Sequence, residues 1–174
     1  MHKYFIITKY LSFFLILSSA YAADLPDYSI DYDPDRKPSL DLAAAIDNAQ
    51  KNNRLVLMIV GGYWCHWCYV LDDFLEKEEE YYNRFYATFE VVKVYYGDEN
   101  RNQKFLSKYP RIRGYPHFFI LDNNYNLVGS QDTGKLEMKL SAARDRYSTG
   151  QMERFLKKWE LYLKDHLTNQ RSSH

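Results

Sequence analysis

Cysteine is nearly absent from this chain of 174 residues, which contains only two. Cys65 and Cys68 are three positions apart, so a bond between them would close too short a loop to staple distant parts of a fold. A disulfide-rich scaffold is therefore excluded. A structural zinc site of four cysteines is excluded as well, because such sites need four ligands. A metal site completed by His66 and His117 stays open as an alternative.

The chain also lacks an excess of charge of either sign, because 23 lysines and arginines balance 23 aspartates and glutamates. A basic surface of the kind that binds nucleic acid is therefore not expected. The 174 residues suffice for one domain with a sizeable core. Aromatic residues are abundant, with 17 tyrosines and 10 phenylalanines, and we interpret them as core and half-buried surface.

A long hydrophobic run is missing too, because the apolar residues 11–17 are too few to span a membrane. Lys3 and Lys9 precede this run and the small-x-small residues 20–22 follow it, which predicts a secretory signal peptide over residues 1–22. An uncleaved N-terminal anchor is the alternative. Export would place the chain in an oxidising compartment, where two closely spaced cysteines favour redox chemistry over structural work.

The two cysteines lie between a strand-like and a helix-like segment. Residues 55–60 form a short, branched, apolar run that is typical of a strand buried on both faces. Gly61 and Gly62 then allow a sharp exit from the sheet. From Cys65 onward apolar residues recur at steps of three and four, which predicts an amphipathic helix. Cys65 is therefore expected at the helix N-terminus.

This position favours a reactive thiol, because the first N–H groups of a helix are unpaired and partly positive. Such placement, or a Cys-x-x-Cys setting, lowers the thiol pKa from about 8.5 to roughly 3.5 to 7.5. Cys65 is the predicted nucleophile, and Cys68, one turn further on the same face, is the predicted resolving thiol. Trp64 is expected to pack around the site and Trp67 to shield the sulfur and contact the partner. His66 is either simply exposed or, when charged, stabilises the thiolate.

The strand, the turn, the sequence Trp64-Cys65-His66-Trp67-Cys68 and the helix resemble the first half of a thioredoxin fold. Residues 112–116 resemble the cis-proline loop that this family places beside the disulfide, and residues 118–121 resemble the strand after it. The resemblance covers residues 40–167 and is closest to exported thioredoxin-like proteins with the motif Gly-Gly-x-Trp-Cys-x-Trp-Cys. It implies an α/β thioredoxin fold, a central mixed β-sheet flanked by helices, here with an N-terminal extension.

The same resemblance implies roles around the proline. It predicts a cis bond between Tyr115 and Pro116, and pairing of the Tyr115 backbone with the substrate chain. His117 follows the proline, where most thioredoxins have threonine, which leaves substrate preference open.

The resemblance also concerns proton transfer. Lys93 aligns with a lysine that the family places on the next strand, and is expected to give proton or electrostatic support. The family's buried acid, six residues before the nucleophile, is replaced here by Ile59, so the group that takes its place is open. The helix after the cysteines carries several acidic residues, Asp72 and Asp73 among them. We interpret these as a solvated face, with one carboxylate handling the Cys68 proton as the alternative.

Turn residues and periodicity divide the rest of the chain. Residues 23–38, polar and proline-containing, are predicted to form an extended leader, residues 39–167 the thioredoxin-like domain, and residues 168–174 a disordered tail. Residues 131–148 show no clear period and receive no assignment. The other expected elements are helices over 41–52, 81–88, 100–109 and from a capping box of Ser148 with Gln151, a strand over 89–95, and a hairpin of 118–121 with 127–128.

Together these features predict an exported thiol:disulfide oxidoreductase in which Cys65 attacks and Cys68 resolves the mixed disulfide. Its partners would be protein thiols or disulfides and a membrane or soluble electron-transfer protein. No cofactor is required beyond the redox-active cysteine pair. The expected location is the periplasm, with secretion as the alternative, and the direction of electron flow is open. The rival interpretations are a non-catalytic thioredoxin-like binding module, either a metal carrier or a chaperone-like adaptor, and a domain of a larger intracellular protein.

Overall fold

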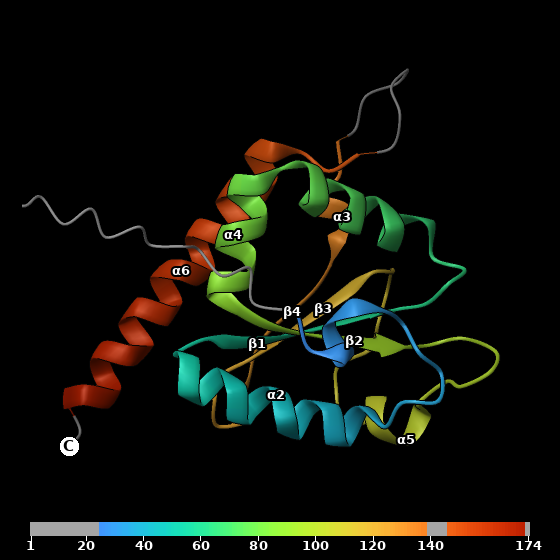
Figure 1. Cartoon of the computed structure of the whole chain (residues 1–174), viewed down its shortest axis with the longest axis horizontal. Helices are drawn as coiled ribbons and strands as arrows, with labels where there is room; N and C mark the ends of the chain where they lie inside the picture. Colours follow the sequence, from blue (N-terminus) through green and yellow to red (C-terminus); the bar gives the residue numbers. More distant parts are fainter. Residues whose placement is uncertain (1–24, 139–145, 173–174) are drawn as a thin grey trace, which may run out of the picture.

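The computed structural model describes residues 25–138 and 146–172 of the chain (Figure 1). The predicted signal peptide over residues 1–22 lies outside the described residues. Four strands form one sheet in the order β2-β1-β3-β4. In chain order the elements are α1 (Asp27–Ile30), α2 (Pro38–Asn52), β1 (Leu55–Gly61), α3 (His66–Lys77), α4 (Glu79–Thr88), β2 (Phe89–Tyr95), α5 (Gln103–Leu106), β3 (His117–Leu121), β4 (Leu127–Asp132), the 3-10 helix η1 (Thr133–Lys135) and α6 (Thr149–Ser172).

Strand β1 lies inside the sheet, pairing in parallel with β2 and antiparallel with β3. Strand β4 pairs antiparallel with β3, which forms the predicted hairpin. Every residue of β1, β2 and β3 is buried. Figure 1 shows α2 and α5 on one side of the sheet and α3, α4 and α6 on the other. The predicted mixed sheet flanked by helices is therefore confirmed.

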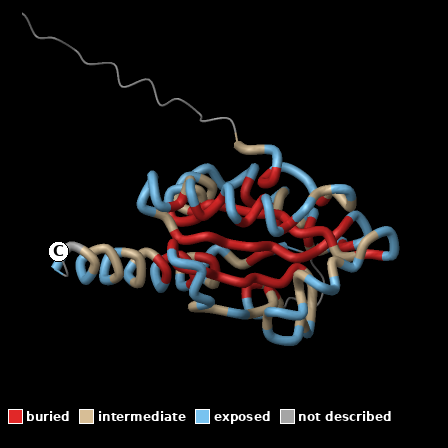
Figure 2. The backbone as a smooth tube through the Cα atoms, turned by 90° about the horizontal axis from the view of Figure 1, so that it is seen from below, coloured by how far each residue is buried: buried red, intermediate tan, exposed pale blue. Residues whose placement is uncertain are grey.

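A hydrophobic core lies on each face of the sheet. Because successive side chains of a strand point to opposite faces, Leu57 and Ile59 belong to the core under α3 and α6, whereas Met58 and Val60 belong to the core under α2. Figure 2 shows the strands as a buried band between exposed segments. The continuous apolar run of residues 55–60 thus corresponds to burial on both faces, as the sequence predicts.

The described part of the leader is folded against the sheet rather than extended. It contains α1, whose Tyr28 is 5% exposed. The Tyr28 hydroxyl donates to Glu90 Oε1 at 2.6 Å, and Ser29 Oγ donates to the Val91 carbonyl. The sequence predicts an extended segment and misses α1, because a single helical turn is too short to show a period. The partners that hold α1 also lie more than 60 residues away on β2.

The helix predicted over residues 100–109 is reduced to the four residues of α5. The side chains of Asn100 and Asn102 explain the shortening. The Asn102 N–H donates to Asn100 Oδ1 at 2.9 Å, and Asn102 Nδ2 donates to the Tyr95 carbonyl at 2.8 Å. Asn102 adopts the left-handed region with φ of 45°. Such local side-chain bonds compete with the helical ladder and delay the helix start.

Residues 131–148, unassigned from the sequence, contain the end of β4, the turn η1 and an isolated antiparallel bridge between Glu137 and Tyr147. Residues 139–145 lie outside the described part. The bridge brings Tyr147 back toward the sheet, where it is 2% exposed. This irregular segment therefore contributes to the core without presenting a period of its own.

Helix α6 begins after Ser148, whose Oγ accepts from the Gln151 N–H at 3.3 Å, so the first half of the predicted capping box forms. Residues 168–172 continue this helix instead of forming the predicted disordered tail. Gln170 Nε2 donates to Asn123 Oδ1 at 3.2 Å, which ties the last turns to the β3–β4 turn. The buried stripe of the helix comprises Met152, Phe155, Leu156 and Trp159.

Candidate active site

The redox pair lies where β1 passes into α3. Cys65 is the N-cap of α3, and its N–H donates to the Gly62 carbonyl at 2.9 Å. Cys68 lies in the first helical turn. The two sulfurs form a disulfide, with 5.3 Å between the Cα atoms. The structure therefore places Cys65 at the partly positive helix end, where the sequence predicts it.

The two cysteines have different surroundings, although both are largely buried, at 3% for Cys65 and 2% for Cys68. The neighbours of Cys65 in the chain, Trp64 and His66, are exposed. Cys68 faces inward, because a Cβ built on Gly61 would clash with its Sγ. Glycine is therefore required at this end of β1 for the helix to bring Cys68 against the strand.

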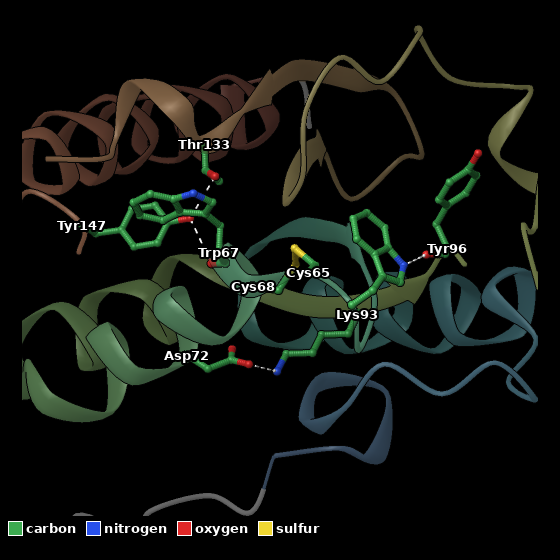
Figure 3. Close-up of a disulfide and its surroundings, with 9 residues drawn as sticks. Cys65, Trp67, Cys68, Asp72, Lys93, Tyr96, Thr133 and Tyr147 are labelled. Atoms are coloured by element: carbon green, nitrogen blue, oxygen red, sulfur yellow. Dashed lines mark hydrogen bonds and ion pairs between the residues drawn. A yellow bond between two sulfur atoms is a disulfide. The ribbon is translucent and has the colours of Figure 1, made fainter. Parts of the chain in front are cut away.

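Trp64 lies on the surface beside the disulfide, 53% exposed. Its indole Nε1 donates to the Tyr96 carbonyl at 2.7 Å (Figure 3). Its ring meets the edge of the Tyr115 ring at 5.0 Å, and Tyr115 stacks on Tyr96 at 5.3 Å. One hydrogen bond and one ring contact thus hold Trp64 beside the loop that the resemblance identifies.

That loop carries the expected proline. The Tyr115–Pro116 bond is cis, and the Pro116 carbonyl accepts from the Thr133 N–H at 3.2 Å. Burial, with lesser contributions from Tyr96, raises the pKa of Tyr115 to about 12. The phenol is therefore neutral at physiological pH, and Tyr115 presents an uncharged surface to whatever contacts the loop.

Trp67 and Tyr147 pack together on the other side of the redox pair. Their ring centroids are 5.6 Å apart in an edge contact. The Tyr147 hydroxyl oxygen lies 2.9 Å from Thr133 Oγ1, within hydrogen-bond distance, and 3.3 Å from the Trp67 carbonyl, which can only accept (Figure 3). The sequence gives no signal for Tyr147 or Thr133, because the segment that carries them has no period.

His117 is buried at 3% exposure, directly after Pro116. Its Nε2 lies 3.0 Å from Ser130 Oγ, and Nδ1 has no hydrogen-bond partner among the described residues. Burial lowers the pKa of His117, and the Asp132 carboxylate opposes that shift. The imidazole is therefore kept neutral by its position in the sheet.

Lys93 forms an ion pair with Asp72, a residue of α3 and not of β1. Ile59, which stands where the resemblance places an acid, is the register partner of Lys93 in the parallel pair. Lys93 is 7% exposed, and its Nζ lies 2.8 Å from Asp72 Oδ2 and 2.7 Å from the Ile30 carbonyl. Figure 3 shows the Asp72 and Lys93 side chains meeting below the disulfide. The carboxylate that pairs with Lys93 therefore comes from helix α3 and not from β1.

A surface pocket of about 420 Å³ opens beside Trp64, formed by the β1–α3 turn and the chain after β2. Aromatic and charged side chains share its wall, including Tyr63, Tyr95, Asp98 and Arg101. The pocket therefore offers both apolar and polar contacts next to the redox pair.

Within residues 25–138 and 146–172, no three or more histidine, cysteine, aspartate or glutamate side chains converge to hold a metal ion. Over the same ranges no helix is long and apolar enough to cross a membrane.

Comparison with known proteins identifies the family. A thioredoxin-like family pattern matches residues 37–123, half of the chain. A disulphide isomerase from Xylella fastidiosa Temecula1 superposes with a TM-score of 0.59 at 24% identity, over 79% of this chain and 98% of that chain. Two further similar structures are a DsbH oxidoreductase, with a TM-score of 0.48 at 15% identity over 80% of this chain and 89% of its own, and the oxidised C-terminal domain of Neisseria meningitidis DsbD, with 0.46 at 16% identity over 75% and 97%.

No curated protein sequence matches the chain. The residues that match the family pattern, 37–123, contain β1, the two cysteines, β2 and β3, which are the features that form the redox site. The chain belongs to the thioredoxin-like family.

Proposed function

We propose that this chain is an exported thiol:disulfide oxidoreductase that exchanges disulfides with protein substrates through Cys65 and Cys68. The observation that supports it most is the Cys65–Cys68 disulfide at the N-terminus of α3. A sulfur at that position is stabilised as a thiolate by the unpaired N–H groups of the helix. Export is proposed from the signal-peptide pattern in residues 1–22.

In the reducing direction, the Cys65 thiolate attacks a substrate disulfide, forming a Cys65–substrate bond and releasing one substrate thiolate. The Cys68 sulfur then attacks Cys65 Sγ, forming the Cys65–Cys68 bond and releasing the second substrate thiolate. The cysteine pair loses two electrons and the substrate disulfide gains them. The reverse sequence oxidises a substrate dithiol. The exposed neighbours of Cys65 and the inward position of Cys68 support this order of attack.

The surface beside Cys65 supports a polypeptide substrate. Trp64 and Tyr115 form an aromatic contact next to the disulfide, and the pocket adjoining Trp64 holds about 420 Å³. We propose that the Tyr115 backbone pairs with the substrate chain and that Trp64 and Trp67 contact it. His66, exposed at the start of α3, is proposed to tune the stability of the Cys65 thiolate.

Two cysteine variants test the mechanism. Cys65→Ser should abolish exchange with a fluorescent peptide disulfide, because the attacking thiolate is lost. Cys68→Ser should instead accumulate a mixed disulfide through Cys65, visible by mass spectrometry under non-reducing conditions. Full activity of Cys65→Ser would contradict the proposal, whereas a protein that never exchanges but binds a stoichiometric metal ion would favour the binding module.

The reduction potential of the pair settles the direction. The purified protein would be equilibrated with glutathione buffers and its free thiols counted. Known pairs range from about −270 mV for thioredoxin to about −120 mV for a strong oxidant. A value near the lower end would mean a reductase that needs an electron-donating partner, and a value near the upper end would mean an oxidase.

A further inference from the structure

The sulfur of Cys68 is enclosed between β1 and the segment before α2. Cys68 is 2% exposed. A Cβ atom built on Gly61 would clash with Cys68 Sγ and would lie 3.0 Å from the Tyr32 hydroxyl oxygen. The sulfur and the hydroxyl are therefore neighbours at this glycine. A thiol buried in this way holds its proton more tightly than a thiol in water. Bulk water is also excluded, so the proton that Cys68 must lose needs an acceptor within the protein.

Three polar side chains from three parts of the chain lie together near Cys68. We call them the Asp72 cluster: Tyr32, Asp72 and Lys93. Lys93 Nζ lies 2.8 Å from Asp72 Oδ2 and 5.4 Å from the centre of the Tyr32 ring. Asp72 follows Cys68 by four residues on α3, so the two side chains lie on one helix face. The carboxylate of the cluster is therefore about one helical turn from Cys68, and the Tyr32 hydroxyl lies next to the Cys68 sulfur.

The cluster has an outlet to solvent. Asp72 and Lys93 line a surface pocket of about 490 Å³ between the segment around Ile30 and α3, and Cys68 does not line it. The Asp72 side chain is 33% exposed, whereas that of Lys93 is 6% exposed. A proton that reaches Asp72 can thus be passed to water.

Other charged groups act on the same carboxyl. Burial raises the pKa of Asp72, Lys93 lowers it, and Glu76 and Asp31 raise it further. Burial raises the pKa of the Tyr32 phenol as well, with smaller contributions from Asp72 and from Tyr147, Tyr86 and Tyr69. Tyr32 therefore stays protonated, and its hydroxyl is a donor rather than a base.

We propose that Asp72, positioned by Lys93, accepts the proton of Cys68 when that thiol resolves the mixed disulfide, and that the Tyr32 hydroxyl stabilises the emerging thiolate. The inference deepens the proposed function and rests on it. The S–H proton of Cys68 passes to the Asp72 carboxylate, and the sulfur forms a bond to Cys65 Sγ. The bond between Cys65 and the substrate breaks, and the substrate sulfur leaves as a thiolate that carries the electron pair. A carboxylate on α3 would thus do what no residue of β1 can do, since Ile59 faces Lys93 there.

The test is a pH profile of the resolution step. Reduced full-length protein would be mixed with oxidised glutathione between pH 5 and pH 9, and the Cys65 mixed disulfide followed by acid quench and mass spectrometry. At pH 6 we expect resolution by Asp72→Asn to be at least about tenfold slower than by the wild type, a modest effect for the loss of a general base. The gap should close toward pH 9, where hydroxide removes the Cys68 proton directly. Formation of the mixed disulfide by Cys65 should be little changed.

Two further variants serve as a control and as a test of the Tyr32 hydroxyl. Asp73→Asn is the matched control, because Asp73 is the neighbouring carboxylate, is exposed and pairs with Lys77, and it should behave as the wild type. Tyr32→Phe keeps the ring over Lys93 and removes only the hydroxyl. We expect it to slow resolution by about threefold, the value of one modest hydrogen bond.

The outcomes separate the possibilities. Equal slowing of Asp72→Asn at every pH would mean a structural role and overturn the inference, as would wild-type rates throughout or the same profile in Asp73→Asn. If the wild type itself forms no mixed disulfide, the proposed function fails instead. Should Asp72→Asn not fold, NMR titration of the Asp72 carboxyl in the wild type decides, because its pKa must coincide with the inflection of the resolution rate.

Discussion

At the scale of single residues, His117 combines a sheet position with a titratable ring. The imidazole is 3% exposed, and burial lowers its pKa, although the Asp132 carboxylate opposes the shift. The unfolded chain, where histidine titrates near about pH 6.5, therefore binds more protons than the folded chain as the pH falls. Folding stability contributed by a neutral His117 is present above that pH and is lost as the pH drops below it.

We predict that His117→Gln reduces the acid sensitivity of folding. Between pH 7 and pH 5 the free energy of unfolding of the wild type should fall with a slope that exceeds the variant's by up to about 1.4 kcal/mol per pH unit. Urea denaturation at several pH values measures both slopes. Ser130→Ala is the control, because it removes the hydrogen bond to Nε2 but keeps the titrating ring, so it should retain the wild-type slope. Equal slopes for wild type and His117→Gln would refute the prediction.

Some site residues can be predicted from the sequence and others cannot, for a physical reason. Cys65 and Cys68 are identified by local pattern, since a strand, a turn and a helix start follow one another without interruption. Tyr147 reaches the Trp67 carbonyl from 80 positions away in the chain. Its place depends on packing of the irregular segment that carries it, and no local rule encodes that packing.

At the scale of elements, the short helix α1 behaves as part of the domain. The Tyr28 hydroxyl donates to Glu90 Oε1 at 2.6 Å and accepts from Asn48 Nδ2 at 2.7 Å, which joins α1 to β2 and α2. Glu90 is 4% exposed, and its second oxygen lies 3.3 Å from Arg54. A buried carboxylate of this kind depends on every donor that it has.

We therefore predict that Tyr28→Phe lowers the free energy of unfolding by about 1–3 kcal/mol, because it leaves the Glu90 carboxylate short of a donor. The urea midpoint would report the loss. Tyr69→Phe, at a tyrosine that is 54% exposed, should stay within about 0.5 kcal/mol of the wild type. A neutral Tyr28→Phe would mean that the segment before α2 does not contribute to folding stability.

Sequence pattern predicts some elements and their boundaries and misses others. The strands β1 and β2 are predictable because their apolar runs are buried on both faces. Helix α5 is not, because the Asn100 side chain accepts from the Asn102 N–H and the Asn102 side chain donates to the Tyr95 carbonyl, and these bonds replace the first helical turn. The C-terminal turns of α6 are polar in sequence, and their order depends on contacts with Asn123 that composition alone does not reveal.

At the scale of the whole molecule, the sheet separates two cores and the redox pair lies at the end of the strand that both cores share. Helix α3 packs on one face, where Cys65 and Cys68 join the core of Leu57 and Ile59. Helix α2 packs on the other face with Met58 and Val60. The N-terminus of α3 is thereby fixed to an inner strand that is buried on both faces, which suits a site whose sulfurs must stay close through repeated bond exchange.

This arrangement predicts an order of hydrogen exchange. Amides of β1 should exchange slowest, because opening that strand breaks pairing with β2 and β3 and disrupts both cores, which amounts to global unfolding. Amides of residues 165–170 in α6 should exchange faster by several orders of magnitude, because that part of the helix is exposed or half-buried and can fray locally. Exchange monitored by NMR or mass spectrometry would rank the two segments. Equal protection would contradict the prediction, because it would require the end of α6 to open only together with the sheet, through the contact of Gln170 with Asn123.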